Sequence, residues 1–494
     1  MAGSVWIWTG PPGGKKGSGP PARNRRSEPP AAAAVAPASP WWRGVGGLHV
    51  LAGDPFVPGE DDAVLALGSW PDAPRGPAGQ AAGRRGPWVW NAAADRVLAL
   101  GPEEIARRLQ REGFAAELAA GRGAGGAGTG GMAGPASRLA ARGADAGGWR
   151  DSFELAVTVF GLEAVELEPY PHGFFREQAL VRRLQRASAR ALLALGLDMG
   201  TVRWRLGGGG RRGTIVGVSP RLGLRTEEGR NRLQEAAAAF AAAWAREAGG
   251  TAEATIGADA EFVLVSPAGK VVPATRFFAP RAAAGADAAL VGGVLRWPLA
   301  ELRPAPAKEP RAVALRLRGL LAAAARRGLP LGGHLHISGA ALTGERLRAL
   351  DNAVALPLRL LEPPGAAGRR PRYGALGDFR PKPHGGFEYR TPPSWLVSPL
   401  VARGALALAK VAAEHARELA AERPLDDDAM RDAFYGGDRE RLLDGARRVH
   451  AALRRTSGYE AHRRDIEPVF RAIELGWHWD ETRDIRRAWR ISTD

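Results

Sequence analysis

Four short apolar segments in the second half of the chain each carry two polar or charged side chains separated by one residue. Residues i and i+2 of a β-strand share a face of the sheet. Burying charges on one face is costly unless they pair with each other or bind a metal ion. The four segments therefore predict one sheet face that lines a polar cavity. The pairs are Asp259 and Glu261, Glu301 and Arg303, His334 and His336, and Glu388 and Arg390.

Each pair taken alone also fits a purely structural role. The two acids fit a solvated strand edge, and each Glu–Arg pair fits an ordinary ion pair. The two histidines fit packed positions bonded to the backbone, although the chain has only nine histidines in 494 residues. The recurrence of one spacing in four segments is what favours a shared site.

Composition limits the class of protein. A chain of 494 residues is long enough for two or three domains. The formal net charge of +17 comes mainly from arginine, which suits nucleotides, phosphates or carboxylates as partners and also fits a GC-rich coding sequence. The absence of cysteine excludes disulfides, Cys-ligated zinc and thiol catalysis. No signal-peptide pattern and no apolar run of membrane-spanning length is found, so the sequence predicts a soluble cytoplasmic protein without a membrane partner.

Composition shifts along the chain predict its division into domains. Residues 1–45 are rich in Pro, Gly, Ala and Arg and read as a disordered tail. Residues 46–250 alternate short apolar runs with helical patterns, which is typical of an α/β region. Within it, the glycine-rich insert 119–138 is not followed by GK[ST] and reads as a linker rather than a phosphate loop. Residues 251–494 form a further domain that ends in helices.

Local patterns predict several helices and strands. Residues 151–170 indicate two strands, 176–197 an amphipathic helix, 201–220 a hairpin and 227–250 an alanine-rich helix. In the second domain, helical patterns cover residues 310–328 and 344–362. Pro357 is expected to kink the second of these helices.

Five motifs in the second half, taken in order, resemble a known family. They span roughly residues 255–425 and read "GADAEFVLV…GKVVPATRFF", "ELRPAPA", "GGHLHISG", "RPRYGALGDFR" and "GFEYRTPPSWLVSP". This series resembles the amidoligases, the carboxylate–amine ligases related to glutamine synthetase and glutamate–cysteine ligase. No motif alone is specific, but the five in this order are.

The resemblance implies an α+β fold in which a glutamine-synthetase-like curved antiparallel sheet is flanked by helices. It also implies a reaction in which ATP and Mg²⁺ (or Mn²⁺) convert a carboxylate to an acyl phosphate, which an amine then attacks. The acid would be a small molecule or a peptide carboxylate. Nothing matches the ammonia-site loop of glutamine synthetase, so the amine stays open.

The resemblance also implies roles for individual residues. Metal ligands are expected at Asp259, Glu261, Glu301, His334 and Glu388. ATP or substrate contacts are expected at His336, Arg372, Arg380 and Arg390, and the last two arginines are expected to assist catalysis. Which histidine binds metal and which faces ATP stays open.

The first half resembles an ATP-grasp ligase more faintly, through "WNAAADRVLAL" and "LGLDMGTVRWRLGGGGRRGTIVGVSPRLGL". The family's two late metal ligands correspond to Gly217 and Ser219, and its early lysine corresponds to Arg96. Because a glycine and a serine replace a carboxylate and an amide, the resemblance implies a degenerate ATP-grasp-like region.

Two other classes of protein remain as alternatives. The HxH pair also occurs in metal-dependent hydrolases, but these need further histidines or an aspartate at other strand ends. A basic nucleic-acid-binding protein would gather arginines and stacking aromatics on one face, whereas here arginines are spread throughout. No nucleic-acid partner is therefore expected. The acid, the amine and the oligomeric state are not determined by the sequence.

Overall fold

A computed structural model describes twelve segments of the chain, which divides into two compact units, Met1–Gly250 and Thr251–Asp494. This division falls at the domain boundary expected near residue 250. The described segments are 4–8, 48–51, 58–59, 62–67, 87–118, 153–168, 178–207, 212–247, 252–280, 282–291, 294–324 and 328–492. The glycine-rich insert 119–138 and all of the expected tail except residues 4–8 lie outside them.

The N-terminal unit contains a parallel sheet in the order β2-β1-β3-β4. Its strands are β1 (Val5–Trp8), β2 (Leu48–Leu51), β3 (Ala63–Ala66) and β4 (Trp88–Trp90). The prediction of a disordered tail over residues 1–45 is therefore wrong for Val5–Trp8, which pairs with two other strands. Val5 and Ile7 are fully buried, so these four β-forming residues gain their stability from pairing with distant parts of the chain.

The same unit contains an antiparallel sheet in the order β6-β5-β7-β8. Its strands are β5 (Phe153–Phe160), β6 (Glu163–Glu168), β7 (Met199–Gly207) and β8 (Arg212–Ser219). Among the described residues of this unit, the helices are α1 (Ala94–Leu98), α2 (Pro102–Arg111), α4 (Gln178–Ala194) and α5 (Glu227–Glu247). The two strands, the hairpin and the two helices predicted over 151–250 are thus confirmed.

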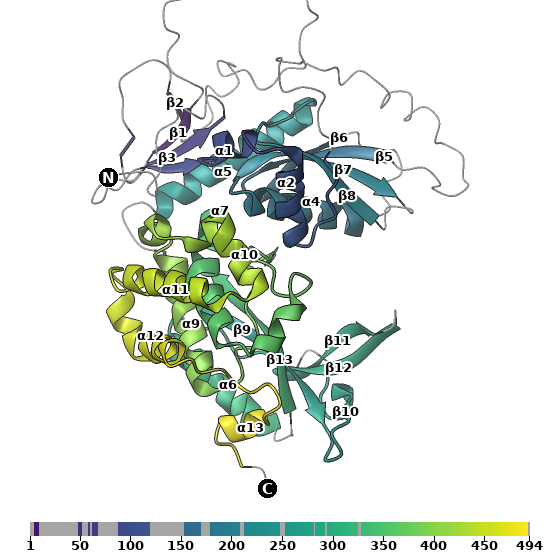
Figure 1. The fold of residues 1–494 in the computed structure, drawn as a ribbon, viewed down its shortest axis with the longest axis vertical. Coiled ribbons are helices and arrows are strands. Elements are labelled where there is room, and N and C mark those ends of the chain that lie inside the picture. The colour runs from purple at the N-terminus through teal and green to yellow at the C-terminus, as the bar shows by residue number, and fades with distance from the viewer. Residues whose placement is uncertain are drawn as a thin grey trace, which may run out of the picture. The chain divides into compact units, whose positions relative to one another are not determined.

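The C-terminal unit is built on an antiparallel sheet in the order β11-β12-β9-β13-β15-β14, with β10 paired to β9. The strands are β9 (Thr255–Val265), β10 (Val271–Val272), β11 (Ala284–Val291), β12 (Val294–Leu302), β13 (Gly328–Ser338), β14 (Phe379–Pro381) and β15 (Phe387–Tyr389). The sheet curls, and the hairpin β11–β12 extends away from the helices (Figure 1).

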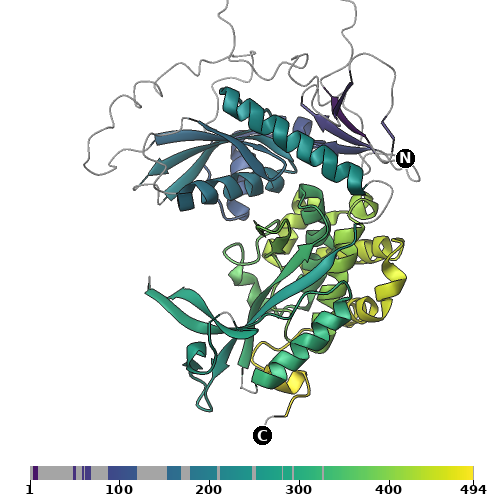
Figure 2. The ribbon, with the colours of Figure 1, turned by 180° about the vertical axis from the view of Figure 1, so that it is seen from behind.

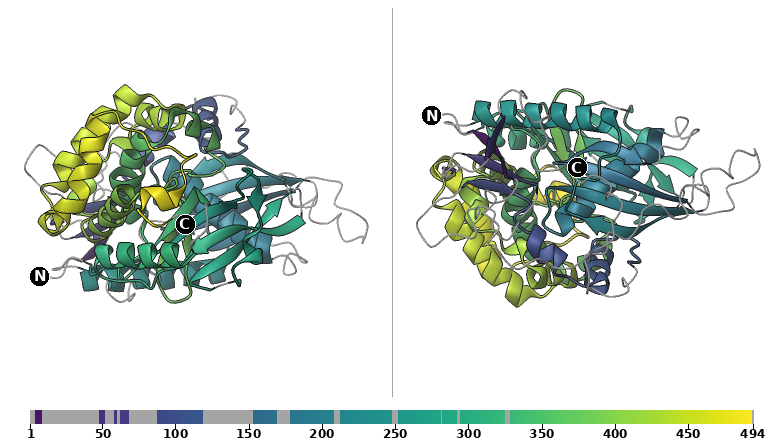
Figure 3. Two further views of the ribbon diagram at one scale, coloured as in Figure 1. Left: turned by 90° about the horizontal axis from the view of Figure 1, so that it is seen from below. Right: turned by 90° about the horizontal axis from the view of Figure 1, so that it is seen from above.

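Helices cover one face of this sheet. The α-helices are α6 (Pro310–Ala324), α7 (Gly344–Leu350), α8 (Leu356–Leu361), α9 (Pro399–Glu414), α10 (Asp428–Gly436), α11 (Arg439–Leu453), α12 (Tyr459–Glu474) and α13 (Ile485–Ala488). Helices α6 and α9 pack on β9, as the view from behind shows, and α12 packs on α9 (Figure 2). Seen from below, the yellow and green helices of this unit lie to one side of its strands (Figure 3).

Alternation along β9 explains why the sheet has one covered face and one polar face. Ala258, Ala260, Phe262 and Leu264 are buried toward the helices. Asp259 and Glu261 occupy the alternate positions and point to the other face. This arrangement of an antiparallel sheet with helices on one side confirms the α+β class predicted for this half of the chain.

The helix predicted over residues 344–362 is interrupted before Pro357. A π-helical turn, η6 (Asp351–Ala355), separates α7 from α8. Proline lacks an N–H, and its ring clashes with the carbonyl of residue i−4. A widened turn at this point relieves the clash. The chain therefore passes from α7 into α8 through a π turn instead of an α-helical turn. Among the described residues, no helix is both long enough and apolar enough to cross a bilayer.

Candidate functional site

A cavity of about 700 Å³ lies on the polar face of the C-terminal sheet. All four i, i+2 pairs predicted from the sequence line it. Strand register brings them together, because His334 lies opposite Asp259, Glu301 opposite Glu261, and Glu388 opposite His336. The expectation of one sheet face that lines a polar cavity is thus met by the structure.

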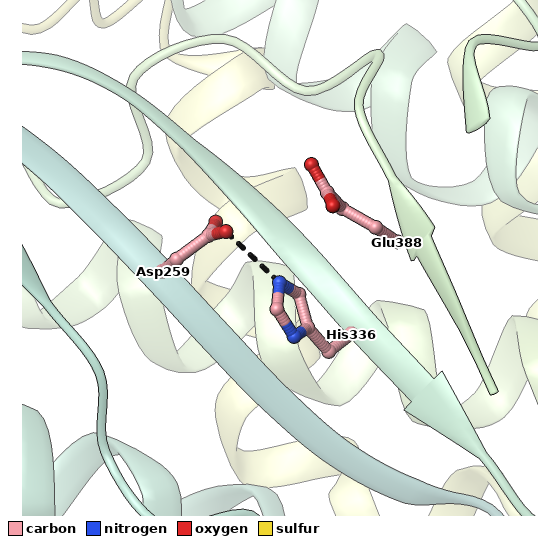
Figure 4. Close-up of side chains that lie close together, drawn as sticks. All are labelled: Asp259, His336 and Glu388. Carbon is pink, nitrogen blue, oxygen red and sulfur yellow. Dashed lines mark hydrogen bonds and ion pairs between the residues drawn. The ribbon is translucent and has the colours of Figure 1, made fainter. Parts of the chain in front are cut away.

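Asp259 lies at the centre of the first group of polar side chains. One carboxylate oxygen accepts a hydrogen bond from the backbone N–H of His334, and the other lies 2.9 Å from Nε2 of His336 (Figure 4). Nδ1 of His334 lies 3.2 Å from Asp259 and 3.1 Å from Glu388. Burial would raise the pKa of Asp259, but the hydrogen bonds from both histidines outweigh it and hold that pKa well below its usual value. Asp259 is therefore ionised at neutral pH.

Glu388 is contacted by three cationic side chains although it is almost fully buried. Lys382 Nζ lies 2.7 Å and Arg380 Nη1 3.1 Å from one carboxylate oxygen, and Arg390 contacts the other. Burial would raise the pKa of Glu388, but Lys382, His334 and the two arginines lower it below its usual value. A buried carboxylate with this much positive charge around it stays ionised.

A second acidic group lies toward the β11–β12 side of the cavity. Donor oxygens of Glu261, Asp287 and Glu301 lie within 4.8 Å of one another. Arg303 contacts Glu301 and donates a hydrogen bond to the carbonyl of Ala282. Burial raises the pKa of Glu261 above its usual value. This end of the cavity has three carboxyl groups and one arginine, so it favours a cation.

The other three-residue donor group in the described part of the chain is Asp259, His336 and Glu388, whose ligand atoms also lie within 4.8 Å of one another. It contains His336, whereas the sequence resemblance assigns the metal to His334 and the nucleotide to His336. His334 Nδ1 is close to the same two carboxylates. Both imidazoles therefore belong to one cluster.

Eight of the nine predicted site residues line the cavity, and Arg372 does not. Its guanidinium lies 5.5 Å over the ring of Tyr373, which does line the cavity. Sequence reasoning missed three acidic or basic lining residues, Asp287, Lys382 and His384. Lys382 and His384 follow Arg380 at i+2 and i+4, but both lie in the turn after β14, where the alternation of a strand no longer applies. Asp287 stands alone in an alanine-rich strand, and no sequence pattern marks it.

Gly285 makes room for Arg303. A methyl group at this position would lie 2.7 Å from Nη1 of Arg303 and 2.7 Å from the carbonyl oxygen of Ala282. We expect Gly285→Ala to lower the free energy of unfolding by about 1–3 kcal/mol, because the backbone cannot move away as a flexible side chain can. Denaturant unfolding measures this. Gly365→Ala is the control, since nothing lies within 4 Å of its added methyl group. An equal, small effect in both variants would contradict the steric argument.

A comparison with protein families matches the phage phiEco32-like COOH.NH2 ligase-type 2 family over residues 256–329 and 327–491. The C-terminal unit is similar to a family of carboxylate–amine ligases. The match confirms the resemblance predicted from the five motifs, and it includes every predicted site residue from Asp259 to Arg390. No curated protein matches the chain. We refer to Thr251–Asp494 as the ligase unit.

The match lies within the ligase unit and does not extend into the N-terminal unit. The similarity to ligases that join a carboxylate to an amine is therefore found in the same unit as the cavity. The polar groups of the ligase unit suit such chemistry, since one cavity offers carboxylates for cations and arginines for anions.

Proposed function

We propose that the ligase unit joins a carboxylate to an amine in an ATP- and Mg²⁺-dependent reaction that proceeds through an acyl phosphate. The observation that carries this proposal is one shared cavity, in which two groups of metal-capable side chains adjoin three cations, Arg380 of β14, Lys382 of the following turn and Arg390 just after β15. A reaction between two anions, a carboxylate and a nucleotide phosphate, needs positive charge at the point where they meet.

The donor sets fit hard divalent cations. Glu261, Asp287 and Glu301 offer only oxygen, which Mg²⁺ prefers, and the first group adds one imidazole to two carboxylates. A cation held there would neutralise charge on the phosphates and polarise them for transfer. The lowered pKa values of Asp259 and Glu388 keep both as anions, which is the state that a ligand requires.

Arg380, Lys382 and Arg390 are proposed to bind the phosphates of ATP. All three contact Glu388, so phosphate oxygens would compete for the same donors. A guanidinium fork can hold phosphate oxygens through two parallel hydrogen bonds. We also propose catalytic roles for Arg390 and Arg380. Arg372 does not line the cavity, so any effect of Arg372 on the nucleotide would come from its contact with the ring of Tyr373, which does.

The proposed bond changes balance in two steps. A carboxylate oxygen of the acid attacks the γ-phosphorus of ATP, the bond to the bridging oxygen breaks, and ADP leaves. The amine nitrogen then attacks the acyl carbon, the C–O bond breaks, and inorganic phosphate leaves while the amine loses a proton. No water takes part, so the cavity walls serve the reaction by excluding it.

The hydrolase alternative is less well supported by the same side chains. In the described part of the chain, the two metal-capable groups contain five carboxylates and His336, and His334 lies beside the first group. Zinc sites that activate water, such as His₃ and His₂Glu, have at most one carboxylate. The carboxylate-rich set favours Mg²⁺ or Mn²⁺.

Isotope transfer tests the proposal. The full chain would be incubated with Mg²⁺, ATP and a panel of amines and acids whose carboxylates carry ¹⁸O. Passage through an acyl phosphate requires ADP release that depends on both substrates, with one ¹⁸O recovered in inorganic phosphate. Recovery of the label in AMP would contradict the acyl-phosphate step. Hydrolysis without any need for ATP would favour the hydrolase.

For the N-terminal unit we propose a degenerate, ATP-grasp-like role without a nucleotide site. The order of its elements, two strands, a helix, two strands and a helix (β5 to α5), supports the resemblance. Other contacts occupy the two positions where ligands are expected. Gly217 lies against the side chain of Arg203, which pairs with Glu154, and Ser219 accepts a hydrogen bond from the backbone of Arg221.

We expect no binding of Mg-ATP by residues 1–250 in a calorimetric titration, because neither Gly217 nor Ser219 offers a carboxylate. The fragment has to begin before Val5, since β1 pairs with β2 and β3. Retention of secondary structure by circular dichroism serves as its control. Micromolar affinity in a folded fragment would show that this unit retains a nucleotide site.

A further inference from the structure

A buried polar contact lies behind the cavity, on the opposite side of β15 from Glu388 and Arg390. The hydroxyl of Tyr389 donates a hydrogen bond to Oδ1 of Asp351, at 2.8 Å. Tyr389 is fully buried and Asp351 is 5% exposed. Neither side chain lines the cavity, so the proposed function has no use for them. A carboxylate buried at this depth is costly and needs a specific partner.

The π turn accounts for the position of Asp351. Asp351 is the first residue of η6, the widened turn that precedes Pro357. Asn352 follows it and accepts a hydrogen bond from the backbone of Leu425, so both polar residues of the turn are bonded to other elements. π turns occur often at functional sites. Here the turn places a carboxylate against the covered face of the catalytic sheet.

Strand β15 is short, although all three of its residues are buried and it pairs with a strand on each side. It contains three residues, pairs with β13 through three residue pairs, and pairs with β14, which is equally short. Side chains alternate along it, so Glu388 and Arg390 point to the cavity only while Tyr389 points away. A rotation or slip of this strand would move both polar side chains at once.

We propose that Tyr389 and Asp351 are a positioning pair that holds β15 so that Glu388 and Arg390 face the cavity. The inference rests on the proposed function, because the pair matters only if Glu388 binds a metal ion and Arg390 binds phosphate.

The test compares Tyr389→Phe with Tyr459→Phe in the full chain. Tyr459 is a buried tyrosine of α12 whose hydroxyl donates to Glu467 at 2.8 Å, so the control removes the same kind of bond away from the cavity. Mn²⁺ affinity is measured by calorimetry, and backbone protection by hydrogen exchange of the peptide that covers residues 379–391. We expect Tyr389→Phe to weaken Mn²⁺ binding about 10- to 100-fold and to speed exchange in that peptide. Tyr459→Phe should change neither.

Asp351→Asn is the second variant. An amide oxygen can still accept the Tyr389 hydrogen bond, so we expect Mn²⁺ affinity and exchange closer to those of the natural sequence. Unchanged exchange at 379–391 in Tyr389→Phe would overturn the inference, and so would faster exchange with unchanged Mn²⁺ affinity. If the natural sequence binds no Mn²⁺, the proposed metal site fails, and hydrogen exchange alone then decides whether the pair holds the strand.

Discussion

Asp259→Asn is expected to reduce turnover by about a thousandfold or more, roughly 4 kcal/mol of transition-state stabilisation. Asparagine keeps the shape and one acceptor oxygen but loses the negative charge that both histidines contact. Without that charge, the proposed first metal group would have one carboxylate, Glu388, in place of two. Turnover is measured as ADP release that depends on acid and amine.

Asp465→Asn is the matched control for this substitution. Asp465 is a buried aspartate of α12 that pairs with Arg311 at 2.6 Å, and it does not line the cavity. Its replacement should lower thermal stability and leave turnover within about threefold of the natural sequence. If Asp259→Asn retains normal turnover, Asp259 has no part in the reaction. If both variants lose turnover and stability together, Asp259 has a structural role.

The spacing of polar residues in apolar strands was enough to predict the cavity. The rule is local, since i and i+2 share a face whatever the rest of the fold, and burying four charged pairs without partners would be too costly. The rule does not extend to Lys382 and His384, because both lie in the turn beyond the end of β14 at Pro381. Sequence could not locate Asp287, because a single acid in an alanine-rich strand is equally compatible with solvent.

Other features depended on contacts between residues far apart in the sequence. Val5–Trp8 has the composition of a strand, but its partners begin at Leu48 and Ala63, beyond a long segment rich in Gly and Pro. Pro357 indicated a disturbed helix, but whether the chain kinks or widens into a π turn depends on what the freed polar groups can bond. The partner of Asp351, Tyr389, lies 38 residues further on.

Arg390→Lys is expected to show whether Arg390 acts in catalysis or only forms an ion pair with Glu388. Arg390 lines the cavity, contacts Glu388 and lies 3.7 Å from Asp378. Lysine keeps the charge but loses the planar fork that can hold two phosphate oxygens. If the fork acts mainly on the transferring phosphoryl group, turnover should fall by about 2–4 kcal/mol, on the order of 30- to 1000-fold, while the KM for ATP changes little.

Arg486→Lys provides the matched control, because Arg486 pairs with Asp484 two residues before it, the same spacing as Arg390 and Glu388. That pair lies outside the cavity lining, so its loss should leave turnover unchanged. Normal turnover with a lowered melting temperature in Arg390→Lys would remove Arg390 from the reaction. A loss of turnover at an unchanged melting temperature would place its guanidinium on the reacting phosphate.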